Sequence, residues 1–381
     1  MAERWDRLRR LVERMGNAHG AAWYPSAGHG PDGVEVSKTR SVTAMYFRKV
    51  TVPLSALPAV QEELELVDAE VHRLALGSSE LGMDTAVAQL LATGGKRMRS
   101  VLLLLTHRAF GGVPDGTEIT AAAAVEMVHA GSLAHDDLMD AATERRGVRT
   151  VNADYGTSMA VMVGDRLLAR AGQAALSVSP QVASELIQSL VELIEGQVME
   201  MTDAYDLGRT EERARRSISL KTGTLFRSGC VIGALTAGVG SGEELELARR
   251  FGDRFGNAFQ ILDDLLDLVS TTELLGKPVG NDLRQGTYTV PLLRALRRPE
   301  LAWISDVLAS EGRDLSDGQV DKVLAALKQG PLIDETLAYV RSLAASAAAV
   351  LDEPAAAGRD WSVLRELPLD YISWAESLIS R

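Results

Sequence analysis

The chain has 381 residues, 46% of them hydrophobic, which is enough to build a substantial core in one large domain or two ordinary ones. A net charge of −12 argues against a general nucleic-acid-binding protein, because such proteins usually carry a basic surplus. One cysteine, Cys230, excludes a disulfide framework and a cysteine-based zinc site. The N-terminus lacks an apolar signal region, and no apolar run reaches the ~18 residues of a membrane-spanning helix. We therefore expect a cytoplasmic protein without stable membrane insertion.

The first 56 residues differ in pattern from the rest of the chain. Trp5 to Met15 is typical of a short amphipathic helix, whereas Gly20 to Val34 is typical of a loop. Ser41 to Val52 alternates weakly between apolar and polar residues, as a strand or an ordered coil would. We assign residues 1–56 to an N-terminal extension of unknown role and residues 57–381 to one folded domain.

From residue 57 onward the chain is a series of helical patterns separated by short breaks. In the first of them Leu64, Val67, Val71 and Leu74 recur at the spacing of an amphipathic helix. The predicted helices are Val60–Ala75, Met83–Ala92, Met98–Phe110, Ile119–Met139, Thr157–Leu176, Pro180–Met201, Thr210–Thr236, Gly242–Val269, Val290–Leu296, Leu301–Ser310, Asp317–Gln329, Leu332–Leu351 and Trp361–Ser380.

These patterns predict an all-α fold, because no alternating pattern of useful length interrupts them. The segment from Ile119 to Ala134 is apolar nearly all round, so it should lie inside a ring of other helices. We expect a single-domain helical bundle around a deep central cavity that opens at one end.

Two acidic clusters end two of these apolar helices. Their aspartates are Asp136, Asp137 and Asp140 in the first cluster, and Asp263, Asp264 and Asp267 in the second. In each cluster the first and last aspartate lie one turn apart on the same helix face, where like charges repel each other and oppose the helix dipole. A bound cation would compensate for both effects. Hard oxygen ligands without Cys or His indicate magnesium, which also binds phosphate oxygens.

Several basic residues are interleaved with these clusters. The glycine pair before Lys96 and Arg99 allows close backbone approach to a phosphate group at a helix start. Arg145 and Arg146 follow the first acidic cluster. Each residue alone is more often a solvated surface charge. Their order along the chain, alternating with the acidic clusters, favours a diphosphate-binding function.

At these motifs, from about Val60 to the C-terminus, the chain resembles the trans-isoprenyl diphosphate synthases of the polyprenyl synthetase superfamily. The matching stretches are GGKRMRS (Gly94 to Ser100), HAGSLAHDDLMD (His129 to Asp140), ERRGVRTVNADYG (Glu144 to Gly156), VGDRLLARA (Val163 to Ala171), KTGTLF (Lys221 to Phe226), FQILDDLLD (Phe259 to Asp267) and GKPVGNDLRQGTYTVPLL (Gly276 to Leu293). The resemblance implies the isoprenoid synthase fold, a homodimer and a magnesium-dependent prenyltransferase that joins isopentenyl diphosphate to an allylic diphosphate and releases pyrophosphate.

The resemblance also implies roles for individual residues. Asp136 and Asp140 would bind two magnesium ions on the allylic diphosphate, and Asp263 would hold a third. The remaining catalytic residues would be Asp137, Asp264, Asp267 and Lys221. Contacts to the allylic substrate would come from Arg145, Lys221, Thr222, Gln260 and Lys277. Contacts to isopentenyl diphosphate would come from Gly95, Lys96, Arg99, His129 and Arg146.

Two positions depart from the family pattern. Ser100 stands where the family often has proline, which is a small change at a helix start. Thr287 stands where many members carry a lysine, so one phosphate contact is lost or is supplied by Arg284.

Residues one turn before Asp136 should line the path of the growing prenyl tail. Gly131 and Ser132 are both small, and Val128 lies deeper. Each added isoprene unit is about as long as one helical turn of roughly 5.4 Å. Because nothing bulky stops the tail at the first turn, we expect a geranylgeranyl or longer product.

Three other interpretations compete with this one. A class I terpene cyclase would share the scaffold but would not need the basic residues assigned to isopentenyl diphosphate. A regulatory subunit of a heteromeric synthase would usually lack one acidic cluster, and both are present here. A helical bundle without catalytic function is the third interpretation.

Overall fold

The computed structural model describes residues 57–77, 82–269, 279–311 and 313–379. The predictions for Trp5 to Met15, Gly20 to Val34, Ser41 to Val52 and Lys277 lie outside these residues. The elements, in chain order, are α3 (Leu57–Ala75), α4 (Met83–Leu91), α5 (Met98–Ala109), α6 (Thr117–Met139), β1 (Glu144–Arg145), β2 (Val148–Arg149), α7 (Val151–Tyr155), α8 (Thr157–Val178), α9 (Pro180–Thr202), α10 (Glu211–Ile218), the π-helical turn η1 (Ser219–Gly223), α11 (Thr224–Thr236), α12 (Glu243–Val269), α14 (Asn281–Arg284), α15 (Val290–Leu296), the 3-10 turn η2 (Pro299–Leu301), α16 (Ala302–Glu311), α17 (Asp317–Leu327), α18 (Leu332–Val350), the 3-10 turn η3 (Pro354–Ala356) and α19 (Ser362–Ile379).

The prediction of an all-α fold is confirmed. Each predicted long helix from residue 57 onward corresponds to a helix whose ends differ by a few residues, with one exception. The segment predicted as one helix, Thr210–Thr236, is helical without a break from Glu211, but the π-helical turn η1 divides it into α10 and α11. A π-turn adds one residue within a continuous helix, without a turn residue to mark its place, so the sequence pattern does not reveal it.

The small elements were also not predicted. They are the antiparallel β1–β2 pair, α7 and α14. Each has five residues or fewer, which is too short for a hydrophobic period to develop.

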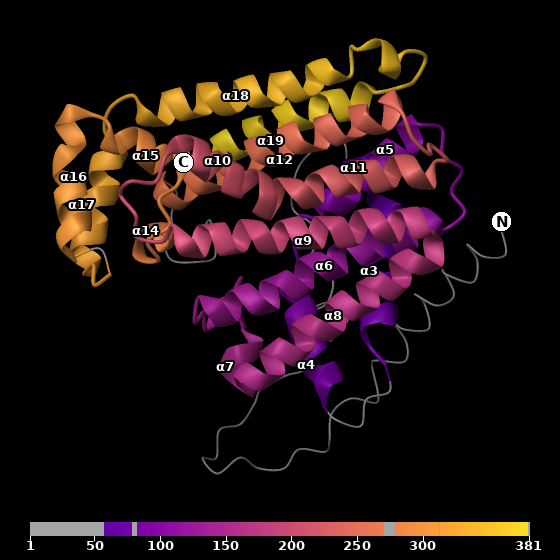
Figure 1. Ribbon diagram of the computed structural model, residues 1–381, viewed down its shortest axis with the longest axis horizontal. Helices are drawn as coiled ribbons and strands as arrows, with labels where there is room; N and C mark the ends of the chain where they lie inside the picture. Colours follow the sequence, from indigo (N-terminus) through magenta and orange to yellow (C-terminus); the bar gives the residue numbers. More distant parts are fainter. Residues whose placement is uncertain (1–56, 78–81, 270–278, 312, 380–381) are drawn as a thin grey trace.

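Helix α6 lies inside the bundle, as its apolar circumference predicted. It packs against α8, α3, α5 and α11, and its run from Ala121 to Ala124 is fully buried. Alanine side chains allow neighbouring helices to approach closely. A second inner layer pairs α11 with α12 and α5, and α18 covers the outer side of α12 (Figure 1).

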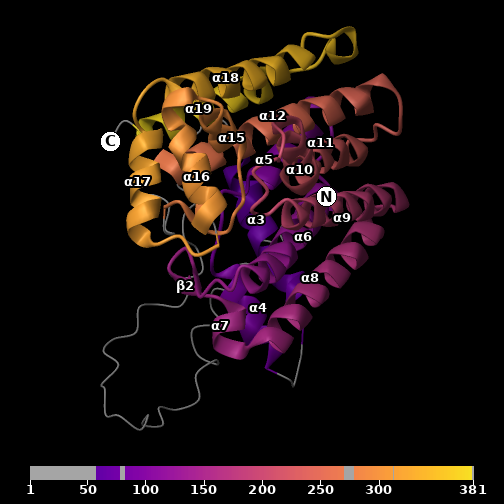
Figure 2. The same ribbon diagram turned by 60° about the vertical axis from the view of Figure 1, so that its left-hand side comes forward.

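The remaining helices are arranged around these layers. α16 and α17 form a pair at one end of the bundle, which comes forward in Figure 2. Local caps define several helix starts. Ser179 caps α9 before a proline at its first turn, and Ser316 forms a capping box with Gln319 at the start of α17.

Glycine permits two close helix contacts that shape the site region. A Cβ at Gly196 on α9 would overlap the backbone nitrogen of Lys221 in η1. A Cβ at Gly164 on α8 would overlap the ring of His135 on α6. These contacts fix the positions of η1 and of the last turn of α6. Among the helices of the described residues, none is both long enough and apolar enough to cross a membrane.

Candidate active site

The carboxyl ends of α6, α9 and α12 lie at the same end of the bundle, beside α14 (Figure 1). The first acidic cluster occupies the end of α6, and Asp140 is its C-cap residue. Asp137 is buried and accepts hydrogen bonds from Arg145, whose Nε and Nη2 atoms both lie 2.7 Å from Asp137 Oδ1. Asp136 and Asp140 remain on the other face. Burial raises the pKa of both carboxyl groups, and the charge of Lys221 opposes this shift.

Lys221 is held by a carboxylate that sequence reasoning missed. Glu200, on the last turn of α9, accepts a hydrogen bond of 2.5 Å from Lys221 Nζ. Burial lowers the pKa of Lys221, but Glu200, Asp136 and Asp140 together outweigh it and leave the pKa raised. Lys221 therefore stays charged between the first acidic cluster and Glu200. An acid at the end of an apolar helix, the same placement as the aspartate clusters, is the signal that could have identified Glu200.

The second acidic cluster is joined to η1 by hydrogen bonds. Thr222 Oγ1 donates to Gln260 Oε1 at 2.8 Å, and Gln260 Nε2 donates to Asp264 Oδ1 at 2.8 Å. Burial raises the pKa of Asp264 to about 7, against the opposing hydrogen bond from Gln260. Asp267 is buried too and accepts a hydrogen bond from the backbone nitrogen of Asp282 at 3.2 Å. Asp263 is thus the member of this cluster that faces the basic residues.

A group of half-buried basic side chains lies together, and three of them are within electrostatic reach of Asp263. Its members are Lys96, Arg99, His129 and Arg146. Burial lowers the pKa of Arg99 to about 10, and burial together with the neighbouring arginines lowers the pKa of His129 well below its usual range. Arg146 donates to the carbonyl of Gly94, and a Cβ at Gly95 would lie 3.2 Å from Arg146 Nη1. Like charges gathered out of water favour binding of an anion.

Arg97, between Lys96 and Met98, has a different role. It adopts a left-handed conformation with φ of 50°, and its guanidinium pairs with Asp68 at 2.7 Å and with buried Glu126 at 3.1 Å. Glu126 also accepts from the backbone nitrogen of Ser100 at 3.3 Å and from its hydroxyl at 2.8 Å. A proline at position 100 would make neither bond, so this departure from the family pattern has a structural counterpart.

The carboxylates fit magnesium by their chemistry. Asp136, Asp140 and Asp263 offer hard oxygen donors. Within the described residues, no three His, Cys, Asp or Glu side chains converge on one point. An ion here would therefore take few protein ligands and complete its coordination with diphosphate oxygens and water, which is the usual manner of magnesium.

A model of the polyprenyl synthetase family matches residues 82–327, which contain both acidic clusters and the whole basic group. This chain belongs to the polyprenyl synthetase family. Curated relatives include nonaprenyl diphosphate synthase of Mycobacterium tuberculosis, 32% identical over 270 residues that cover 70% of this chain and 78% of the relative. Heptaprenyl diphosphate synthase component 2 of Geobacillus stearothermophilus is 34% identical over 284 residues, which cover 73% of this chain and 86% of the relative.

Solved structures of polyprenyl synthetases share the fold. A polyprenyl synthase from Caulobacter crescentus, crystallised with calcium and isoprenyl diphosphate, has a TM-score of 0.76 and 29% identity, covering 86% of this chain and 97% of its own. A decaprenyl diphosphate synthase from Rhodobacter capsulatus has a TM-score of 0.74 and 27% identity, covering 85% and 98%. The chain therefore has the all-α isoprenoid synthase fold and is a prenyltransferase by family.

The segment from Arg284 to Thr287 makes contacts that the sequence motifs did not show. Thr287 donates its backbone N–H to Asp282, and Arg284 pairs with Asp317 on α17 at 2.9 Å instead of facing the acidic clusters. Gln285, from the same loop, donates a side-chain hydrogen bond to Asp140. The loop after the second acidic cluster thus reaches the first one.

The three residues predicted to control chain length do not all lie on one face of α6. A Cβ at Gly131 would lie 3.1 Å from the Gly164 carbonyl oxygen and 3.2 Å from Leu168, so Gly131 faces α8. Ser132 follows the Asp136 face of the helix, because four residues turn it by only about 40°. Val128 is buried. The contact with α8 gives Gly131 a packing reason to be small.

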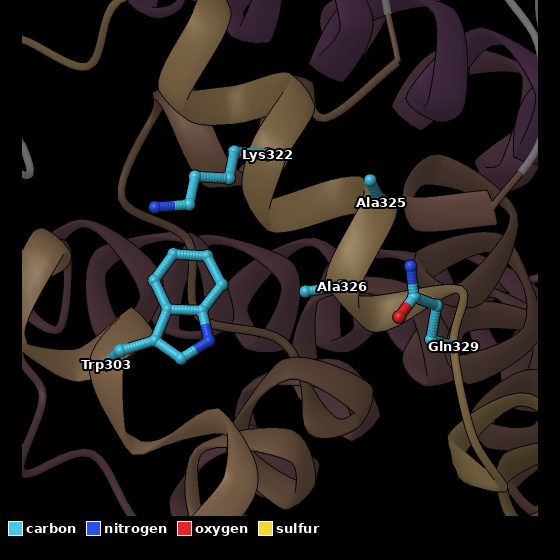
Figure 3. Close-up of a pocket in the computed structure, with 5 residues that line it drawn as sticks. All are labelled: Trp303, Lys322, Ala325, Ala326 and Gln329. Atoms are coloured by element: carbon cyan, nitrogen blue, oxygen red, sulfur yellow. The ribbon is translucent and has the colours of Figure 1, made fainter.

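A surface hollow lies between α16 and α17 (Figure 3). Its lining residues are Trp303, Lys322, Ala325, Ala326 and Gln329. Lys322 Nζ lies 4.7 Å from the centroid of the Trp303 ring. None of the residues assigned to the two acidic clusters or to the basic group lines this hollow.

Glu200→Gln tests the carboxylate that holds Lys221. Removing its charge leaves Lys221 attracted only to Asp136 and Asp140, where it would compete with a metal ion. We expect kcat/KM for prenyl transfer to fall by about tenfold to a hundredfold, with unchanged helicity by circular dichroism. Glu195→Gln, an exposed change on the same helix, is the matched control. An equal effect of both substitutions would contradict the role of Glu200.

Proposed function

We propose that this polyprenyl synthetase condenses isopentenyl diphosphate with an allylic diphosphate and makes a geranylgeranyl or longer polyprenyl diphosphate. One observation carries the proposal. Asp263 lies within electrostatic reach of Asp264 in the second acidic cluster and of the half-buried basic group, so the acidic and the basic residues can each serve one diphosphate, the acidic ones through magnesium and the basic ones directly. A cyclase with one diphosphate substrate would have no use for the second site.

On the acidic side, Asp136, Asp140 and Asp263 would hold magnesium on the allylic diphosphate. Magnesium held there would neutralise that diphosphate and make it a better leaving group. Lys221, fixed by Glu200, adds a positive charge beside the same leaving group. Thr222 and Gln260 support Asp264 and so hold the end of α12 against η1. Departure of pyrophosphate leaves an allylic cation in the bundle interior.

On the basic side, Lys96, Arg99 and Arg146 bind the diphosphate of isopentenyl diphosphate. His129, kept neutral by burial and by its cationic neighbours, offers a hydrogen bond rather than a charge. The isopentenyl double bond then attacks the allylic cation, and the resulting carbocation loses a proton to the released pyrophosphate. No catalytic side-chain base is required.

Asp136→Asn tests the reaction and its metal dependence together. The full-length enzyme, supplied with magnesium, isopentenyl diphosphate and each allylic primer in turn, should release pyrophosphate and yield prenyl diphosphates, and chelation should stop it. Asp136→Asn should lower kcat by about a hundredfold or more, since a lost metal ligand costs several kcal/mol. Asp321→Asn, an exposed change on α17, is the control.

Other outcomes of this assay identify the alternatives. Hydrocarbon in place of prenyl diphosphate would indicate a terpene cyclase. Turnover that appears only when a second protein is added would indicate a subunit of a heteromeric synthase. Full activity of Asp136→Asn would contradict the metal assignment.

Product length is expected to depend on Ser132. The relatives include heptaprenyl, octaprenyl and nonaprenyl diphosphate synthases, and also two short-chain isoprenyl diphosphate synthases, so their names alone do not fix the product length. Ser132→Phe would place a ring one turn below Asp136, on the face along which the tail runs. We expect its main product to be shorter by one or more isoprene units, as measured by chromatography of the dephosphorylated products. Ser132→Ala should leave the distribution unchanged, and an unaltered product with phenylalanine would refute this path for the tail.

An apolar stripe on α9 supports the proposed homodimer. Its members are Ile187, Val191, Ile194, Val198 and Met201, each 45% to 56% exposed. Their alternating spacing of four and three places them on one helix face, as in a coiled-coil seam. Two copies of such a seam are complementary to each other about a two-fold axis. We therefore assign the stripe to a second copy of this chain.

Ile194→Glu tests this interface. The wild type should sediment at about twice the 40.9 kDa chain mass, and Ile194→Glu should shift it towards the monomer, because a carboxylate would be buried in the seam. Val113→Glu, at an equally exposed apolar position outside α9, should remain dimeric. A monomeric wild type would overturn the assignment.

A further inference from the structure

The ammonium group of Lys96 lies in a cage of aromatic rings. Lys96 Nζ is 4.9 Å from the ring centroid of Trp374, 5.1 Å from that of Tyr371 and 5.3 Å from that of Phe259. It also donates a hydrogen bond of 2.7 Å to the hydroxyl oxygen of Tyr371. Tyr371 and Trp374 come from α19, near the C-terminus, while Phe259 precedes Gln260 on α12.

The rings of the cage also support one another. The rings of Phe259 and Tyr371 are stacked with centroids 4.8 Å apart, and Tyr371 contacts Trp374 at 5.5 Å. Tyr371 is 1% exposed. Its ring is therefore immobilised by packing, and its hydroxyl is held at a defined place beside Lys96.

Lys96 differs from other buried cations of the site in its partners. Lys221 pairs with Glu200, Arg145 with Asp137, and Arg97 with Asp68 and Glu126. Among the described residues, no carboxylate lies within ion-pair distance of Lys96. Burial lowers the pKa of Lys96, and the negative charge of Asp263, acting at longer range, raises it in part.

Arg99 also lies against an aromatic ring. Its guanidinium lies 5.3 Å from the ring centroid of Phe226, and the Phe226 and Phe259 rings are 4.8 Å apart. Its buried Nε has no hydrogen-bond partner among the described residues. One continuous aromatic cluster therefore underlies both cations. Ring faces attract a cation without neutralising its charge, so an anion can still bind it.

We propose that Tyr371 and Trp374 on α19 are positioning residues for Lys96, holding its ammonium ready for the diphosphate of isopentenyl diphosphate. This rests on the proposed function of the basic site. A free lysine side chain samples many rotamers, and ordering it costs free energy when the substrate binds. The cage orders Lys96 beforehand. A carboxylate partner would also order it, but would compete with the substrate for the same charge.

Tyr371→Phe separates positioning from folding, because it keeps the packed ring and removes only the hydroxyl group. We expect KM for isopentenyl diphosphate to rise by about three- to tenfold, the usual effect of one lost hydrogen bond. KM for the allylic primer and kcat should each change by less than about twofold. The melting temperature should change only slightly. Trp374→Leu, which removes one wall of the cage, should raise the same KM.

Tyr339→Phe is the matched control. The Tyr339 hydroxyl accepts a hydrogen bond of 3.2 Å from Arg215, which also places a cation beside a tyrosine, but on α18 rather than α19. This substitution should leave both KM values unchanged. If Tyr339→Phe raised KM for isopentenyl diphosphate as much as Tyr371→Phe does, the effect would follow from the loss of any tyrosine hydroxyl, and the proposal would be overturned.

A second measurement does not depend on turnover. Lys96 should react slowly with an amine-reactive ester in the wild type, as followed by peptide mass spectrometry, and faster in Tyr371→Phe and Trp374→Leu. Equal labelling in all three, or an unchanged KM in an active Tyr371→Phe enzyme, would refute the positioning role. Absence of prenyl transfer in the wild type would instead refute the proposed function, so the two failures are distinguishable.

Discussion

The ion pair between Glu200 and Lys221 is the interaction on which the arrangement of the site depends. Lys221 lies within the electrostatic reach of Asp136 and Asp140, and Glu200 acts on Asp264 of the other cluster. The π-helical turn that carries Lys221 can approach α9 only because residue 196 is glycine. The pair thus links α9 to η1 and places a positive charge beside Asp136 and Asp140 at the end of α6, where uncompensated carboxylates would otherwise repel each other.

The basic residues divide into two groups with different physical support. Arg97 and Arg145 are neutralised by buried carboxylates, so they hold the turn before α5 and the end of α6 in place. Lys96 and Arg99 contact aromatic rings, which leave their charge available for an anion. A basic motif read along the chain therefore contains both cations neutralised by carboxylates and cations whose charge stays available for a ligand, and the partner of each cation decides which it is.

Much of the fold follows from hydrophobic periodicity. The long helices were predictable because each repeats its apolar positions over several turns. Helix α6 was predictable as an inner helix because apolar residues occur on nearly all of its faces. The turn η1, the β1–β2 pair and α14 were not, because their geometry depends on contacts with distant segments rather than on local pattern. Glu200 shares the helix-end placement of the aspartate clusters, but its role comes from the lysine that faces it, which only the tertiary structure shows.

The sequence by itself predicted the chemistry that we propose for the site. Two pairs of aspartates one helical turn apart predicted metal ligands, and the helix period alone showed that Asp137 would point away from Asp136 and Asp140. Only the tertiary structure decided which charges are available to a ligand. Arg145 is paired with Asp137, Gln285 reaches Asp140 from a loop far along the chain, and the C-terminal helix encloses Lys96. Such pairings join residues distant in sequence, and no local pattern encodes the distance between them.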